Sequence, residues 1–197
     1  MFSSINKEDR QFIFSFAVLT GAGSIAGLML LSLLFSQIVV RVLGETDAPE
    51  EMTAGLLILS LILNVIPGIM IGLGQWFELR NLFPRAGWWI VVTAVGWLVG
   101  FGVGSLVYLV FPGLPFAILF AFRFASIGLF SGVGQWLYLK QHLSNANLWI
   151  PVAILVALIG GFSWYIASEI GGAIGWIIAG GISGYALLLL RERSLMS

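Results

Sequence analysis

Residues 12–40 read FIFSFAVLTGAGSIAGLMLLSLLFSQIVV, a run of 29 residues that contains no charged side chain. A helix rises about 1.5 Å per residue, so about 20 apolar residues suffice to cross the hydrocarbon core of a bilayer. The apolar core of a secretory signal peptide is only about 7–15 residues long. This stretch therefore predicts an uncleaved membrane-spanning helix. Because it is longer than needed, we expect it to tilt, to kink near residues 21–23 or to emerge from the bilayer.

The composition of the whole chain indicates lipid rather than water as its solvent. Of the 197 residues, 59% are hydrophobic and 9% are charged, and the mean hydropathy is +1.04. Soluble domains carry about 25% charged residues, so this chain has too little polar surface to face water. The net charge of zero gives no indication of nucleic-acid binding. The lack of cysteine excludes disulfides and thiolate chemistry.

Further apolar runs follow the first one. Each run is continuously apolar instead of alternating, which favours helices over a transmembrane barrel. We therefore predict an all-α polytopic membrane protein, with one transmembrane domain over residues 1–197 and about six spanning helices. The predicted spans are residues 12–40, 52–77, 88–111, 114–139, 148–167 and 170–190.

Charged residues sort between the two sides of these spans. The positive-inside rule places short loops rich in Lys and Arg in the cytoplasm, which predicts that both termini are cytoplasmic. On that side lie seven of the nine basic residues: Lys7, Arg10, Arg80, Arg85, Lys140, Arg191 and Arg193. The connections on the other side carry the carboxylates Glu45, Asp47, Glu50, Glu51 and Glu169. The two remaining basic residues are Arg41, at the outer end of the first span, and Arg123, within the fourth.

The chain contains an internal repeat. A shift of 60 positions lays residues 68–100 over residues 128–160 without a gap, and 12 of the 33 positions are identical. The best-matched part is GLGQWFELR at 72–80 against GVGQWLYLK at 132–140. So long a gapless match is more than an apolar, glycine-rich composition would produce by accident.

These matches define the expected repeat units. Each unit has a helix that enters the cytoplasm, a short turn and a helix that leaves it, so successive units run in the same direction. We place the units at about residues 53–111 and 113–167. Gly180 and Gly184 form a pair four residues apart, like the pairs 68/72 and 128/132 in the two units. A degenerate third unit, from 168–193 plus 12–43, would then complete a pseudo-threefold arrangement.

Glycine and tryptophan recur in the repeated segments. Glycines four residues apart allow helix backbones to approach closely in lipid, and the indole ring favours the headgroup region. The predicted packing glycines are Gly68, Gly72, Gly96, Gly100, Gly104, Gly128, Gly132, Gly180 and Gly184. The predicted interfacial anchors are Trp76, Trp89, Trp136, Trp149, Arg80 and Lys140. Gln75 and Gln135 have a second interpretation, because this pair could bind a ligand or bridge helices.

The repeated G-x-G-Q-W-x-x-L-[RK] motif, followed by a helix that begins with Trp, resembles a group of multi-pass bacterial membrane proteins found mainly in photosynthetic bacteria. The resemblance covers about residues 68–159. The last span departs from it, because no Gln-Trp pair precedes Arg191. The group has no established activity. The resemblance therefore implies a fold and a bacterial inner or photosynthetic membrane as the location.

Arg123 is the residue at which the sequence most favours a functional role. It lies inside the fourth predicted span, where a charge costs about 2.5–3.5 kcal/mol on insertion scales, so we expect it to face the bundle interior. The repeat places Asn64 at nearly the same depth. An Arg123–Asn64 polar layer could hold an anion. Alternatively, Arg123 bonds to backbone carbonyls, Asn64 or Glu169 and only fixes the packing.

Catalytic and metal-binding patterns are weak in this sequence. His142 is the only histidine and lies in a predicted loop, where a lone imidazole is typically solvated. The string GISG at 181–184 resembles the serine motif of rhomboid intramembrane proteases, but no histidine follows Ser183 to take its proton. We therefore predict no enzymatic activity, no cofactor and no metal site.

Two functions are consistent with these features. The first is a non-catalytic scaffold, assembly or accessory subunit that acts through intramembrane helix and lipid contacts. Its partners would be the bilayer and other membrane proteins or a second copy, and not nucleic acid. The second is a small-solute or anion transporter or channel that uses the Arg123–Asn64 layer, since transporter sites lie near the midplane at repeat interfaces.

Overall fold

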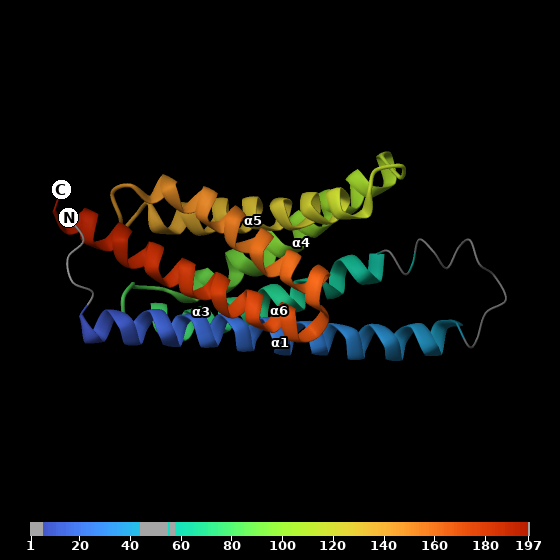
Figure 1. Ribbon diagram of the computed structural model, residues 1–197, viewed down its shortest axis with the longest axis horizontal. Coiled ribbons are helices and arrows are strands. Elements are labelled where there is room, and N and C mark those ends of the chain that lie inside the picture. Colours follow the sequence, from blue (N-terminus) through green and yellow to red (C-terminus); the bar gives the residue numbers. More distant parts are fainter. Residues whose placement is uncertain (1–5, 44–54, 56–57, 197) are drawn as a thin grey trace.

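A computed structural model describes residues 6–43, 55 and 58–196 of the chain, without the side chains of residues 39–43, 168 and 169 (Figure 1). The described part consists of helices and their connections. Its helices are α1 (Lys7–Leu43), α3 (Val65–Leu79), α4 (Gly87–Val110), α5 (Phe116–Leu139), the short 3-10 helix η1 (Ala146–Leu148) and α6 (Trp149–Leu195). Outside the description lie the predicted acidic residues Glu45, Asp47, Glu50 and Glu51, and the side chains of Arg41 and Glu169.

The described helices include six that are long and apolar enough to cross a membrane. They are Lys7–Ile38, Ile58–Leu79, Gly87–Val110, Phe116–Leu139, Ala146–Ala167 and Ile170–Leu195. This confirms the predicted all-α polytopic fold and makes the chain an integral membrane protein.

The first span begins earlier than the apolar run at residue 12. The side chain of Asn6 accepts from the backbone N–H of Asp9 at 2.8 Å, and Asp9 in turn accepts from the backbone N–H of Asn6 at 3.2 Å. This reciprocal cap satisfies two backbone donors that a helix start leaves open. The cap starts α1 at Lys7, so five charged or polar residues extend it beyond its apolar part.

Helix α6 doubles back on itself and forms two spans (Figure 1). An added Cβ at Gly160 would meet the ring of Trp176, and one at Gly175 would meet the side chain of Ser163. Residues so far apart in sequence touch only if the helix reverses, since a straight helix separates them by about 1.5 Å per residue. The predicted division between the fifth and sixth spans thus agrees with the fold.

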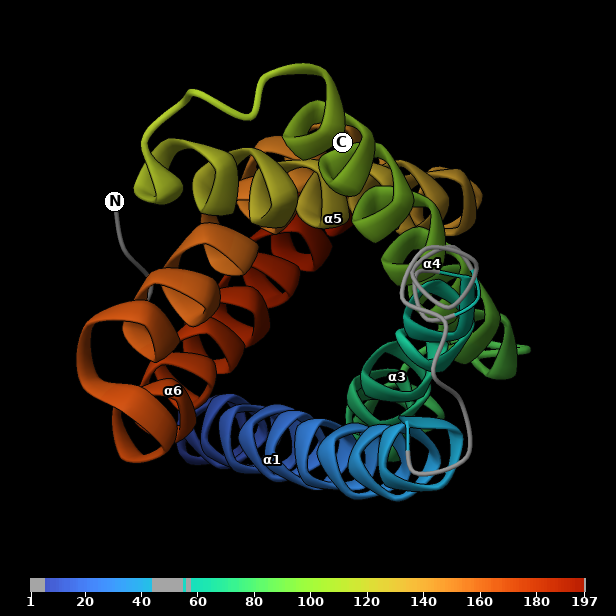
Figure 2. The same ribbon diagram turned by 90° about the vertical axis from the view of Figure 1, so that its right-hand side faces the viewer.

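The helices form a closed ring when seen along the bundle (Figure 2). Helix α1 packs against α3, α3 against α4, α4 against α5, α5 against α6, and α6 against α1. The start of α1, the α3–α4 turn, the α5–α6 turn and the end of α6 all lie at one end of this ring (Figure 1). That end carries Lys7, Arg10, Arg80, Arg85, Lys140, Arg191 and Arg193. We call it the basic end.

Glycines bring the helices of the ring into close contact. A Cβ added to Gly72 would lie 2.9 Å from the Cα of Ile90, and one added to Gly132 would lie 2.7 Å from the Cβ of Ala153. The other predicted packing glycines face neighbouring helices as follows: Gly68 to Ala94, Gly96 to Ser131, Gly100 to Ile127, Gly104 to Arg123, Gly128 to Ile154, Gly180 to Thr20 and Gly184 to Phe16. At Gly184 the nearest atom is 3.3 Å away, so this contact is looser than the others.

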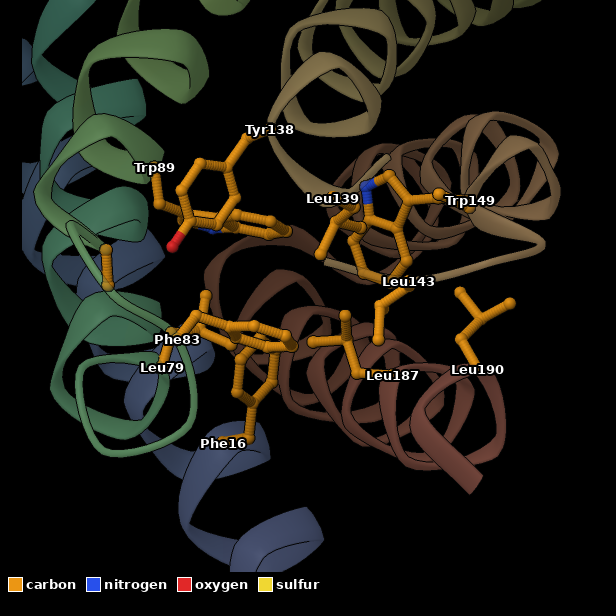
Figure 3. Packing of buried hydrophobic residues seen from close by; sticks show 12 residues of the cluster. Phe16, Leu79, Phe83, Trp89, Tyr138, Leu139, Leu143, Trp149, Leu187 and Leu190 are labelled. Carbon is orange, nitrogen blue, oxygen red and sulfur yellow. The ribbon is translucent and has the colours of Figure 1, made fainter. Parts of the chain in front are cut away.

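Two clusters of buried side chains fill the ring. The larger one lies at the basic end (Figure 3) and contains Phe16, Leu79, Phe83, Ala86, Trp89, Tyr138, Leu139, Leu143, Ala146, Trp149, Leu187 and Leu190. The second cluster contains Ile71, Trp97, Ile127, Val156, Trp176 and Ala179. Both clusters draw side chains from several helices, so they tie the ring together across its interior.

Candidate functional site

Two glutamine–tryptophan hydrogen bonds form the polar centre of the ring. The indole Nε1 of Trp89 donates to Oε1 of Gln75 at 2.7 Å, and Nε1 of Trp149 donates to Oε1 of Gln135 at 2.8 Å. Each bond joins the helix before a basic-end turn to the helix after it. All four side chains are buried, so each bond satisfies polar groups that are removed from the molecular surface.

A further pair of bonds links these two bridges. Nε2 of Gln135 donates to Oγ1 of Thr93 at 2.9 Å, and the Thr93 hydroxyl donates to the backbone carbonyl of Trp89 at 2.7 Å. The rings of Trp89 and Trp149 lie 5.6 Å apart at an interplanar angle of 60°, within the range of favourable aromatic pairs. Polar bonds and ring contact therefore connect α3, α4, α5 and α6 at one level.

A small cavity lies beside this network. Its volume is about 40 Å³, and Gln75, Thr93, Ser131, Gln135 and Ser183 contribute its polar lining. Among the described residues, Nε2 of Gln75 meets no acceptor, and the buried Oγ of Ser131 has no hydrogen-bond partner. The Ser183 hydroxyl donates to the carbonyl of Ala179 at 3.0 Å. A cavity of this size accommodates one or two water molecules and no larger ligand.

The tryptophans predicted as interfacial anchors divide into two kinds. Trp89 and Trp149 are 0% and 2% exposed, which differs from the expected position among lipid headgroups. Their N–H groups turn inward because Gln75 and Gln135 offer acceptors there. Trp88, the residue before Trp89, is by contrast 59% exposed on the outer surface.

Trp76 and Trp136 are partly buried near the basic end. The predicted cations Arg80 and Lys140 lie against their rings. The guanidinium of Arg80 lies 5.3 Å from the Trp76 ring centre, and Nζ of Lys140 lies 4.8 Å from the Trp136 ring centre. These are cation–π distances. The two cations cover apolar ring surface at the end of their spans.

Arg123 and Asn64 are not joined by a hydrogen bond in the described structure. Nδ2 of Asn64 donates to the carbonyl of Ser60 at 2.7 Å, within its own helix. The guanidinium of Arg123 lies over the ring of Phe101 at 4.6 Å, and its backbone packs against Gly104. Arg123 lies in the first third of α5. It is therefore close to the end of the ring opposite the basic end, and not at the predicted midplane of the membrane.

The two turns at the basic end pack on each other. The Tyr138 hydroxyl donates to the carbonyl of Pro84 at 2.7 Å, and the ring of His142 stacks on Phe83 at 5.8 Å. His142, expected as a solvated loop residue, is thus partly buried between aromatic rings. Arg85 has φ 54°, in the left-handed region, which costs an arginine about 1–3 kcal/mol.

Sequence reasoning missed the tryptophan partners of the two glutamines. A signal for them existed, since Gln75 and Trp89 recur together as Gln135 and Trp149 at the same spacing. The exposed Trp88 does not recur, because Leu148 stands at the matching position. Retention of both partners in the repeat would have indicated the pair.

Neither a metal-binding cluster nor a known relative assigns a role to these residues. Within residues 6–43, 55 and 58–196, no three His, Cys, Asp or Glu side chains gather where they could hold a metal ion. No protein-family model, curated protein or solved structure matches this chain.

Proposed function

We propose that this chain is a non-catalytic membrane scaffold, assembly or accessory subunit that acts through intramembrane contacts with helices and lipids. The buried glutamine–tryptophan network in the ring carries the proposal. Gln75 and Gln135 are engaged by Trp89 and Trp149, and the adjoining cavity of about 40 Å³ is too small for a solute path. The polar groups inside the ring therefore serve to hold the helices together. Partners would bind on the outer surface.

The internal repeat supports a rigid, self-contained ring. Equivalent glycines contact equivalent residues on the next helix: Gly72 with Ile90, Gly132 with Ile150 and Gly184 with Ile13. A second set repeats this pattern: Gly68 with Ala94, Gly128 with Ile154 and Gly180 with Ala17. We infer three hairpins around a pseudo-threefold axis, the third made from the second arm of α6 and α1.

The third hairpin carries apolar side chains at the network positions. In this register Leu187 corresponds to the two glutamines, and Phe16 corresponds to Thr93. Both side chains are buried in the basic-end cluster. Phe16 has no hydroxyl group at the position that corresponds to Thr93. Nε2 of Gln75 therefore lacks an acceptor equivalent to the one that Nε2 of Gln135 finds in Thr93.

The basic end is proposed to face the cytoplasm. It collects seven of the nine basic residues of the chain, and the positive-inside rule then orients the bundle. Both ends of the chain would lie on that side. The resemblance of the repeated motif supports a bacterial inner or photosynthetic membrane as the location.

Partner recognition would occur on the apolar outer surface. Phe14, Met29 and Leu33 of α1 are all exposed, and helices of other membrane proteins or a second copy could pack against such a surface. Co-purification tests this. The full chain, extracted from its native membrane in a mild detergent, is expected to carry a membrane-protein partner or a second copy at defined stoichiometry. A bare 21.4 kDa monomer under all such conditions would contradict the proposal.

Anion passage is a second candidate function, favoured by one observation. Arg123 lies within a spanning segment, and its guanidinium lies over the ring of Phe101 with no carboxylate partner among the described side chains. Liposomes that contain the protein test for flux of a small anion. Flux that disappears in Arg123→Leu, while Arg80→Leu retains it, would favour this candidate over the scaffold.

A further inference from the structure

A groove lies between α4 and α5 at the basic end. It has a volume of about 530 Å³. Its lining comes from the α3–α4 turn, the start of α4, the end of α5 and the following turn: Pro84, Arg85, Trp88, Val92, Gly134, Leu137, Tyr138, Gln141 and His142. We call it the α4–α5 groove.

The groove extends from the turns into the apolar part of the spans. Val92 and Gly134 lie more than one helical turn inside the ends of α4 and α5, so the inner part reaches hydrocarbon depth. Trp88 and Leu137 are 59% and 45% exposed. Both side chains therefore leave the groove open to the surrounding lipid. An occupant with an apolar body and a polar end would match this profile.

The mouth of the groove is built to attract an anion. Arg85, Gln141 and His142 line it with nitrogen donors, and no carboxylate is among the described lining residues. Arginine matches the oxygens of phosphate through its planar array of donors. The left-handed backbone of Arg85, with φ 54°, is unusual for this residue type, and such strain is concentrated at functional positions.

A second groove of the same design lies between the two arms of α6. Its volume is about 180 Å³, and its lining residues are Leu148, Val152, Ala186, Leu189, Leu190 and Arg193. In the proposed repeat these match residues of the α4–α5 groove, with Leu148 for Trp88, Val152 for Val92, Ala186 for Gly134, Leu189 for Leu137 and Arg193 for Gln141. We call it the α6 groove. Apolar walls and a basic mouth thus occur together twice.

We propose that the α4–α5 groove and the α6 groove each bind one anionic glycerophospholipid from the leaflet at the basic end. Arg85 and Arg193 contact the phosphate, and an acyl chain lies along Val92 in one groove and Val152 in the other. This inference deepens the proposed function, on which it rests, by naming the lipid class that the outer surface holds.

Charge favours a lipid over a second copy of the chain in these grooves. Two copies inserted in the same direction place their basic ends in the same leaflet. The grooves would then face the like charge of a neighbouring basic end, which is unfavourable. An anionic headgroup instead gains about 1 kcal/mol for each Arg or Lys near it, equivalent to about a fivefold change in affinity.

Native mass spectrometry of the full chain tests the proposal. The protein is released from vesicles of equal parts dioleoylphosphatidylglycerol and dioleoylphosphatidylcholine, which share acyl chains and differ in headgroup charge. The wild-type chain is expected to retain two molecules of the anionic lipid in preference to the zwitterionic one. Arg85→Gly retains one, and the Arg85→Gly, Arg193→Gln double variant retains neither above the zwitterionic level, with each affinity lowered about fivefold or more.

The choice of variants keeps folding and binding apart. Glycine adopts the left-handed backbone at position 85 without cost, so Arg85→Gly removes the side chain and preserves the turn. Arg80→Gln is the matched control, because it removes the same charge at the same end from a residue that lines neither groove. This control is expected to retain both anionic lipids.

Three results would overturn the proposal: unchanged retention in the double variant, an equal loss in Arg80→Gln, or a second copy of the chain in place of lipid. The co-purification test reports on protein partners and not on lipid stoichiometry. A failure of the scaffold function is therefore distinguishable from a failure of the lipid sites.

Discussion

The indole of Trp149 donates a 2.8 Å hydrogen bond to Gln135, and the same glutamine donates a 2.9 Å bond to Thr93 on another helix. One buried amide thus joins three helices. Gln75 uses only its oxygen in this way, toward Trp89 at 2.7 Å. The two repeated glutamines therefore differ in the number of contacts that depend on them.

This difference predicts an order of stabilities. Gln75→Leu leaves one buried donor without its acceptor, which costs about 1–3 kcal/mol. Gln135→Leu leaves the Trp149 donor unpaired and also removes the bond to Thr93, so it costs more. Unfolding of the detergent-solubilised protein in increasing denaturant measures both. Equal effects, or a larger effect at Gln75, would contradict the proposed network.

A double-mutant cycle isolates the bridge itself. Trp149→Phe removes the donor and should destabilise wild-type protein more than it destabilises Gln135→Leu, because the bond is already lost in that background. Intramembrane hydrogen bonds measured in this way average about 0.6 kcal/mol, so we expect coupling of at least that size. Additive effects would show that the bond contributes nothing.

Close packing of α4 against α5 predicts a steep response at Gly100. A Cβ added at Gly100 would collide with the backbone of Ile127, so Gly100→Val should separate the helices and destabilise the fold by about 1–3 kcal/mol or more. Gly113→Ala is the control, since nothing lies within 4 Å of a Cβ there. Thermal unfolding in detergent compares the two variants. Similar melting temperatures would mean that the two helices are not in contact at this glycine.

Adjacent tryptophans on α4 should respond oppositely to lipid. Trp88 is exposed and Trp89 is fully buried, so brominated acyl chains should quench the fluorescence of Trp88 far more strongly. Trp88→Phe is expected to remove much of the quenching and leave stability unchanged, whereas Trp89→Phe keeps the quenching and destabilises the protein. Loss of quenching in Trp89→Phe, with quenching retained in Trp88→Phe, would contradict the exposure of Trp88 to lipid.

The spans could be predicted from sequence, whereas the directions of individual side chains could not. Run length and hydropathy fix where a helix must cross a bilayer. Hydropathy cannot distinguish Trp88 from Trp89, because the difference lies in which neighbour each ring meets. It also misses the start of α1, where a polar cap between Asn6 and Asp9 extends the helix.

The candidate grooves show a similar division. The basic charge of Arg85 and Arg193 is plain in the sequence, but the left-handed backbone at Arg85 has no sequence signal, since no glycine marks it. Depth along the spans is the only sequence feature that pairs Arg123 with Asn64. The Asn64 side chain bonds to the carbonyl of Ser60 instead, a local choice that depth in the membrane does not determine.

Cysteine labelling tests the central claim, a ring of six spanning helices with both repeated turns on one face, most directly. The chain has no native cysteine, so Asn81→Cys, Asn145→Cys and Gly113→Cys each introduce one reactive thiol at an exposed position. A membrane-impermeant maleimide applied to intact spheroplasts should label the cysteine at position 113. It should label those at positions 81 and 145 only after permeabilisation. Labelling that puts positions 81 and 145 on opposite faces, or position 113 on the same face as either, would contradict the account.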